Sequence, residues 1–81
     1  MNREEVIADL IKFAAMAYRK DASLINENTK ISEELGVQSA QRVAMSASIE
    51  DEYDVTVAVA KFGQFETIGD LADYVIEEAD E

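Results

Sequence analysis

The stretch ELGVQSAQRVAM, residues 34–45, places a Leu-Gly pair before an isolated serine and a run of small and apolar residues. Gly36 predicts a turn. A helix is predicted over residues 40–53, and Ser39 stands just before it, where its hydroxyl can accept a hydrogen bond from an early backbone N–H. The residues expected on the inward side of this helix are Val43, Ser46, Ala47, Ile49 and Tyr53.

Two further helices are predicted from capping patterns at their N-termini. Asn2 and Glu5 have the spacing of a capping box before apolar residues at helical spacing, which predicts a helix over residues 3–19. Thr67 and Asp70 repeat that pattern before an apolar stripe, which predicts a helix over residues 68–78. The acidic tail, residues 77–81, is expected to fray.

Two connections are less regular. Residues 20–37 lack clear periodicity, and their apolar residues are expected to pack across the bundle: Leu24, Ile25, Ile31 and Leu35. Val55, Val57 and Val59 alternate with small residues, which could indicate a strand. Because one strand would have no partner, we favour an extended link into a short helix near residues 60–65. The sequence thus predicts an all-α fold, a four-helix bundle with three longer helices and a short third one, forming a single domain over residues 1–81.

Composition excludes several kinds of chemistry. The 81 residues include no Cys and no His, which removes disulfides, thiolate nucleophiles and the usual general base. The net charge of −11 falls entirely in residues 33–81, because residues 1–32 hold five acids and five bases. Such a surface repels nucleic acid and anionic membranes and attracts basic proteins, or it serves solubility alone. No apolar run is long enough for a membrane span or a signal peptide, so a cytoplasmic location is expected. The protein is also expected to be a monomer.

The order of elements resembles the acyl carrier protein family over nearly the whole chain. The best-matched parts are Leu35-Gly36, Ser39, Val43, residues 49–54 and Thr67-Ile68. In that family a serine at the start of the second helix carries 4′-phosphopantetheine, usually within Asp-Ser-Leu. Here the triplet is Gln38-Ser39-Ala40, and Ala44 stands where many members have glutamate.

The resemblance implies a carrier rather than an enzyme. Ser39 would hold the phosphopantetheine arm, whose thiol would bear an acyl group as a thioester. The expected partners are a phosphopantetheinyl transferase and acyl-loading and acyl-transfer enzymes with basic patches. The residues expected to contact them are Gln38, Ala40, Ala44, Glu50, Asp51, Glu52 and Asp54, and the expected acyl pocket is lined by Val43, Ala47, Phe62 and Phe65. No dedicated metal site is expected, since a calcium-binding loop starting at Asp21 would need glycine where Asn26 stands.

Other interpretations stay open. Ser39 could be a helix cap alone, and the small residues after it could simply allow close helix packing. The atypical triplet would also suit an unmodified interaction module on the same fold. Catalysis by Ser39 is weakly supported, because no histidine can activate it. Among carriers, the departures favour a specialised member serving lipid, lipopolysaccharide or secondary-metabolite synthesis, and we favour envelope lipids.

Overall fold

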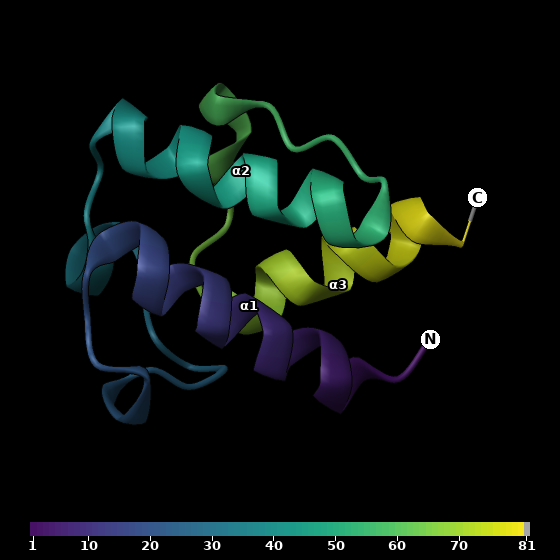
Figure 1. The fold of residues 1–81 in the computed structure, drawn as a ribbon, viewed down its shortest axis with the longest axis horizontal. Coiled ribbons are helices and arrows are strands. Elements are labelled where there is room, and N and C mark those ends of the chain that lie inside the picture. The colour runs from purple at the N-terminus through teal and green to yellow at the C-terminus, as the bar shows by residue number, and fades with distance from the viewer. Residues whose placement is uncertain (81) are drawn as a thin grey trace.

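Three α-helices form the body of the protein (Figure 1). The computed structural model describes residues 1–80, and α1 covers Arg3–Tyr18, α2 Ser39–Tyr53 and α3 Ile68–Ala79. Three shorter helical turns lie in the connections: η1 Ala22–Leu24, η2 Ile31–Leu35 and η3 Val59–Gln64. The described residues form no strand, so the predicted all-α class is confirmed.

The helix starts follow the predicted caps. The Asn2 side chain accepts hydrogen bonds from the backbone N–H groups of Glu4 and Glu5, at 2.8 and 3.2 Å. Thr67 and Asp70 form a complete capping box, in which each side chain accepts from the backbone of the other residue. Because the caps satisfy N–H groups that have no partner within the helix, they fix where α1 and α3 begin.

The C-terminal end of α3 is more ordered than predicted. Fraying was expected from residue 77, but the helix continues to Ala79, and the Asp80 N–H donates to the Ile76 carbonyl at 3.1 Å. The expectation is therefore wrong for Glu77 and Glu78, while Glu81 lies outside the described residues. Val75 and Leu71 are buried one and two turns earlier, and this packing holds the helix past its acidic residues.

The long connection between α1 and α2 is tied to the start of α3 by backbone hydrogen bonds. The Ile31 N–H donates to the Glu66 carbonyl at 2.9 Å, and the Ile68 N–H donates to the Thr29 carbonyl at 3.1 Å. Three of the four residues predicted to pack inward are buried: Ile25, Ile31 and Leu35. The prediction is wrong for Leu24, which is 74% exposed because the η1 turn directs it outward.

The segment after α2 is an extended link, as the sequence analysis favoured, and it is not a strand of a sheet. Val55 and Val57 are buried, and the Val57 carbonyl accepts a hydrogen bond from Ser46 Oγ at 2.7 Å. A side chain of α2 thus satisfies one buried backbone carbonyl of the link without a neighbouring strand. The predicted short third helix near residues 60–65 is confirmed as η3, one residue earlier.

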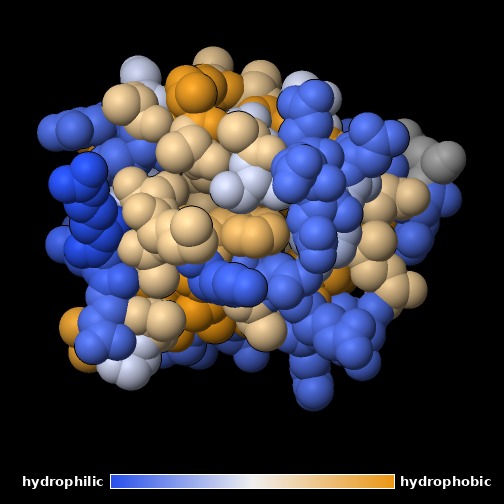
Figure 2. Space-filling view, in the orientation of Figure 1, coloured by the Kyte–Doolittle hydropathy of each residue, from blue (hydrophilic) through white to orange (hydrophobic). Residues whose placement is uncertain are grey.

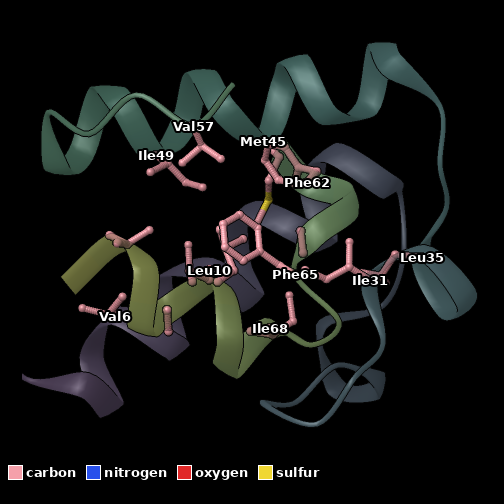
Figure 3. Packing of buried hydrophobic residues seen from close by; sticks show 14 of the residues in the cluster. Val6, Leu10, Ile31, Leu35, Met45, Ile49, Val57, Phe62, Phe65 and Ile68 are labelled. Carbon is pink, nitrogen blue, oxygen red and sulfur yellow. The ribbon is translucent and has the colours of Figure 1, made fainter. Parts of the chain in front are cut away.

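The core lies where α1, α2, α3 and η3 meet (Figure 3). Leu10, Met45, Ile49 and Phe62 are all at most 1% exposed. The predicted inward side of α2 is correct for Ile49, and Ser46 and Tyr53 are half-buried. It is wrong for two members, since Val43 is 54% exposed and Ala47 is also exposed. The longer Met45 side chain reaches Phe62 from the same side of the helix as Ile49, so α2 is rotated toward that side.

We expect Met45→Ala to destabilise the protein much more than Val43→Ala. The first change leaves a cavity in the core and should lower the free energy of unfolding by about 2–4 kcal/mol. The second removes exposed methyl groups and should change it by less than about 0.5 kcal/mol. Urea unfolding of both variants measures this, and equal losses would contradict the observed rotation of α2.

Candidate functional site

Ser39 is the first residue of α2 and is exposed to solvent. The N-cap residue is Gln38, with φ −73° and ψ 136°, and its side chain makes no capping hydrogen bond. The predicted capping role of Ser39 is therefore wrong, because the helix begins one residue earlier than expected. Its hydroxyl lies at the surface, and within residues 1–80 it has no hydrogen-bond partner.

The backbone at the start of α2 offers free donors. The first hydrogen bond of the helix runs from the Arg42 N–H to the Gln38 carbonyl, at 3.2 Å. The N–H groups of Ser39, Ala40 and Gln41 come before it, so they have no partner within the helix. Together with the helix dipole, such groups favour an anion at this position.

Gly36 allows the chain to enter α2 at this place. Its φ of +146° and ψ of 172° favour glycine, and its N–H donates to the Ile31 carbonyl at 3.0 Å. A Cβ added here would lie 2.9 Å from Gln41 Oε1 and would strain the backbone in addition. The Leu-Gly pair therefore ends η2 and leads the chain to the start of α2 through a conformation that other residues rarely adopt.

On one side of Ser39, α2 presents an apolar surface. We call it the outward face of α2, and its exposed members are Ala40, Val43, Ala44 and Ala47. Figure 2 shows apolar surface over the upper left, above the first half of α2 and η3, and hydrophilic surface to the right, where α2 ends. Val37, just before the helix, is 62% exposed and adds to this surface.

The acids predicted to bind partners lie at the far end of α2, and all are exposed: Glu50, Asp51, Glu52 and Asp54. Glu50 follows Ser39 by about three helical turns and points to the same side. Asp51 and Glu52 turn toward α1, where they line a surface hollow of about 210 Å³ together with Asp9. These acids therefore do not form one cluster around Ser39.

A hydrogen bond holds the acidic end of α2 against α1. The Tyr53 hydroxyl donates to the Asp9 carboxylate. Partial burial, and then this carboxylate, raise the pKa of Tyr53 above its ordinary value. The phenol stays protonated at neutral pH, so it remains a donor and keeps the last turn of α2 in place.

On the other side of Ser39 lies Arg42, which sequence reasoning passed over. Arg42 Nη2 donates to Ser32 Oγ at 3.4 Å, while its Nε is buried and has no hydrogen-bond partner. The Tyr18 hydroxyl is also buried without a partner. Burial raises the pKa of Tyr18, and the positive charge of Arg42 acts in the opposite direction, which places the two groups near each other. The available signal was that Arg42 is the single base between Lys30 and Lys61.

The structure does not bring the four residues of the predicted acyl pocket together. Phe62 and Phe65 lie in the core, and the Phe65 ring packs against Tyr74 with centroids 5.0 Å apart. Val43 and Ala47 belong to the outward face, so they line no interior pocket, and that part of the prediction is wrong. A surface hollow of about 330 Å³ opens beside Phe65, but most of its lining is polar.

Two other features bear on what the surface can bind. Within residues 1–80, no three acidic side chains lie close enough together to hold a metal ion. Over the same residues, the helices are too short or too polar to cross a membrane.

Comparisons with known proteins identify the family of the chain. The family model described as a phosphopantetheine attachment site matches residues 5–75. The chain is similar to the acyl carrier protein of Exiguobacterium sp. strain AT1b, with 27% identity over 93% of this chain and 95% of the relative. It is similar to the acyl carrier protein of Thermotoga maritima, with 27% identity over 91% of each chain, and to that of Exiguobacterium sibiricum, with 23% identity over 93% and 95%.

The chain therefore belongs to the phosphopantetheine-attachment family of acyl carriers. Its prosthetic group is 4′-phosphopantetheine, and it is a carrier rather than an enzyme. The residues at the start of α2 fit this group, because an exposed hydroxyl there stands beside free backbone donors and an arginine with unused donors.

We expect Ser39→Ala to leave stability nearly unchanged. The Ser39 hydroxyl makes no capping bond, so its removal should alter the free energy of unfolding by less than about 0.5 kcal/mol. Thr67→Ala is the matched control, because Thr67 is a true cap and its loss should cost about 1 kcal/mol. Thermal or urea unfolding compares the two variants. If Ser39→Ala lowers the free energy of unfolding as much as Thr67→Ala does, Ser39 acts as a cap after all.

Proposed function

We propose that Ser39 carries the 4′-phosphopantetheine arm of this carrier and that the arm holds an acyl group for partner enzymes. The observation that supports this assignment is the position of Ser39, exposed and without hydrogen-bond partners at the first residue of α2. A transferase can reach such a hydroxyl without unfolding the chain. The arm supplies the thiol that a thioester requires and that this sequence, which has no cysteine, lacks.

The other four serines are less suitable. Ser46 Oγ donates to the Val57 carbonyl, and Ser23 Oγ donates to the Asp21 carboxylate. Ser32 Oγ accepts from Arg42, and Ser48 lies half-buried in the last part of α2. Three of these hydroxyls are engaged and the fourth is partly covered, whereas Ser39 is neither.

The outward face of α2 supports a two-part contact with partner enzymes. Gln38, Ala40 and Ala44 are exposed and uncharged, so the serine end of α2 carries no acid on the side away from Arg42. The acids begin about three turns later, at Glu50, with Asp51, Glu52 and Asp54 beyond it. A partner would therefore bring apolar side chains to the serine end and basic side chains to the acidic end. The basic contacts would raise the association rate more than the affinity.

The departures from the usual Asp-Ser-Leu triplet support a specialised carrier. A transferase or acyl-transfer enzyme that contacts Gln38 and Ala40 meets no carboxylate beside the serine. We favour a lipid, lipopolysaccharide or secondary-metabolite pathway, with envelope lipid synthesis first and with action in the cytoplasm. An acyl chain that entered the bundle would meet Phe62 and Phe65, the two predicted pocket residues that lie in the core.

Intact-mass measurement tests the attachment residue. After incubation with coenzyme A and a broad-specificity phosphopantetheinyl transferase, the protein should gain the mass of one phosphopantetheine. Ser39→Ala should abolish the gain, because no other serine stands free at a helix start. Ser48→Ala is the control and should be modified like the natural protein. If several transferases leave the natural protein unmodified, an interaction module on the carrier fold becomes the better interpretation.

Charge removal at the acidic end of α2 should slow partner association. In Glu50→Gln/Asp54→Asn, we expect the rate constant for modification at limiting transferase to fall about three- to tenfold at low salt. Asparagine tolerates the left-handed conformation of Asp54, whose φ is 57°. Glu4→Gln/Glu77→Gln makes the same charge change on α1 and α3 and should have little effect. Equal slowing by both pairs would indicate that net charge alone attracts the partner.

A further inference from the structure

Arg42 lies beside the attachment residue on the first turn of α2. Residues three apart on a helix are neighbours, with Cβ atoms about 5–6 Å apart, so Arg42 adjoins Ser39. Helical side chains also lean toward the N-terminus of their helix. The contact from Arg42 Nη2 to Ser32, which precedes α2 in the chain, agrees with that direction.

Most N–H donors of the Arg42 guanidinium make no hydrogen bond to the rest of the described chain. Arginine carries five N–H groups, and here they make one long hydrogen bond, of 3.4 Å, while the buried Nε makes none. None of the carboxylates within residues 1–80 forms an ion pair with Arg42. By contrast, Arg3 binds Glu27 and Asp73 at 3.0 and 2.8 Å. The Nε atom is covered by protein, so an anion at the surface would bind the terminal Nη groups, of which Nη1 makes no hydrogen bond within residues 1–80 and is not buried.

Arg42 is an isolated positive charge in an acidic sequence. The chain has 18 acids and 7 bases, and Arg42 is the single base of α2. A cation in the first turn is unfavourable to the helix dipole. Arg42 is therefore placed where neither the dipole nor a carboxylate of the described chain stabilises it.

We propose that Arg42 binds the phosphodiester of the arm carried by Ser39, together with the free backbone N–H groups of the first turn. The inference rests on the proposed attachment to Ser39. A phosphodiester carries one negative charge and acceptor oxygens, which suit both a guanidinium and a helix N-terminus. Arg42 holds the base of the arm in this way and leaves the distal thiol free to reach partner enzymes. The competing role is a purely structural one, in which Arg42 only ties α2 to Ser32.

Nuclear magnetic resonance of the natural protein, before and after modification, tests the contact directly. We expect the Arg42 Nη–H resonances to shift downfield and their exchange with solvent to slow when the arm is attached. We also expect the phosphorus-31 resonance of the modified protein to move in Arg42→Gln. Unchanged Nη–H resonances, or the same phosphorus-31 shift in both proteins, would overturn the proposal and leave the structural role.

Stability gives a second readout with a matched control. The melting temperature of the modified form minus that of the unmodified form should be lower by about 2–6 °C in Arg42→Gln at low salt. Lys12→Gln removes the same charge from an exposed position on α1 and should leave this difference unchanged. Equal effects of the two variants would overturn the proposal. If Arg42→Gln does not fold, the resonances of the natural protein and of Arg42→Lys decide the question.

The failure of this inference can be told from the failure of the proposed function. If Ser39 is not the attachment residue, the intact mass shows either no gain or a gain that survives in Ser39→Ala. If the gain depends on Ser39 but Arg42 does not respond to it, only the phosphate contact is overturned.

Discussion

The burial of Ile49 and the packing of Met45 against Phe62 set the rotation of α2, and the geometry of the site depends on it. Successive residues of a helix are separated by about 100°, so fixing two buried positions fixes the direction of every other one. Ser39 then lies between two different surfaces. The outward face, with Val43 and Ala47, lies on one side, and Arg42 lies on the other, toward Ser32.

A second constraint fixes where α2 begins. The backbone hydrogen bonds between residues 29–31 and residues 66–68 hold the long connection against the start of α3. From this anchor, η2 and the Gly36 turn lead directly into Ser39. The exposed hydroxyl is thus positioned by backbone bonding and a glycine conformation, and it needs no hydrogen bond of its own.

The helices could be predicted wherever a local signal was strong. Asn2 and Thr67 mark helix starts by capping chemistry, and these starts agree with the structure. The rotation of α2 could not be predicted, because small residues on all its sides give a weak apolar pattern, and only tertiary contact with Phe62 distinguishes Met45 from Val43. Arg42 was not predicted as a site residue, because an isolated base in a sequence is usually a solvated side chain. Only the buried Nε shows otherwise.

The charges of α2 oppose its own dipole at both ends. A cation stands near the N-terminus, and acids stand near the C-terminus, where each is unfavourable to an isolated helix. Neither placement assists folding, and burial of Met45 and Ile49 has to stabilise the helix in spite of both. The charges become favourable when an anion is held at Ser39 and the basic side chains of a partner protein contact Glu50. The charge pattern of α2 therefore suits its modified and partner-bound states better than the free chain.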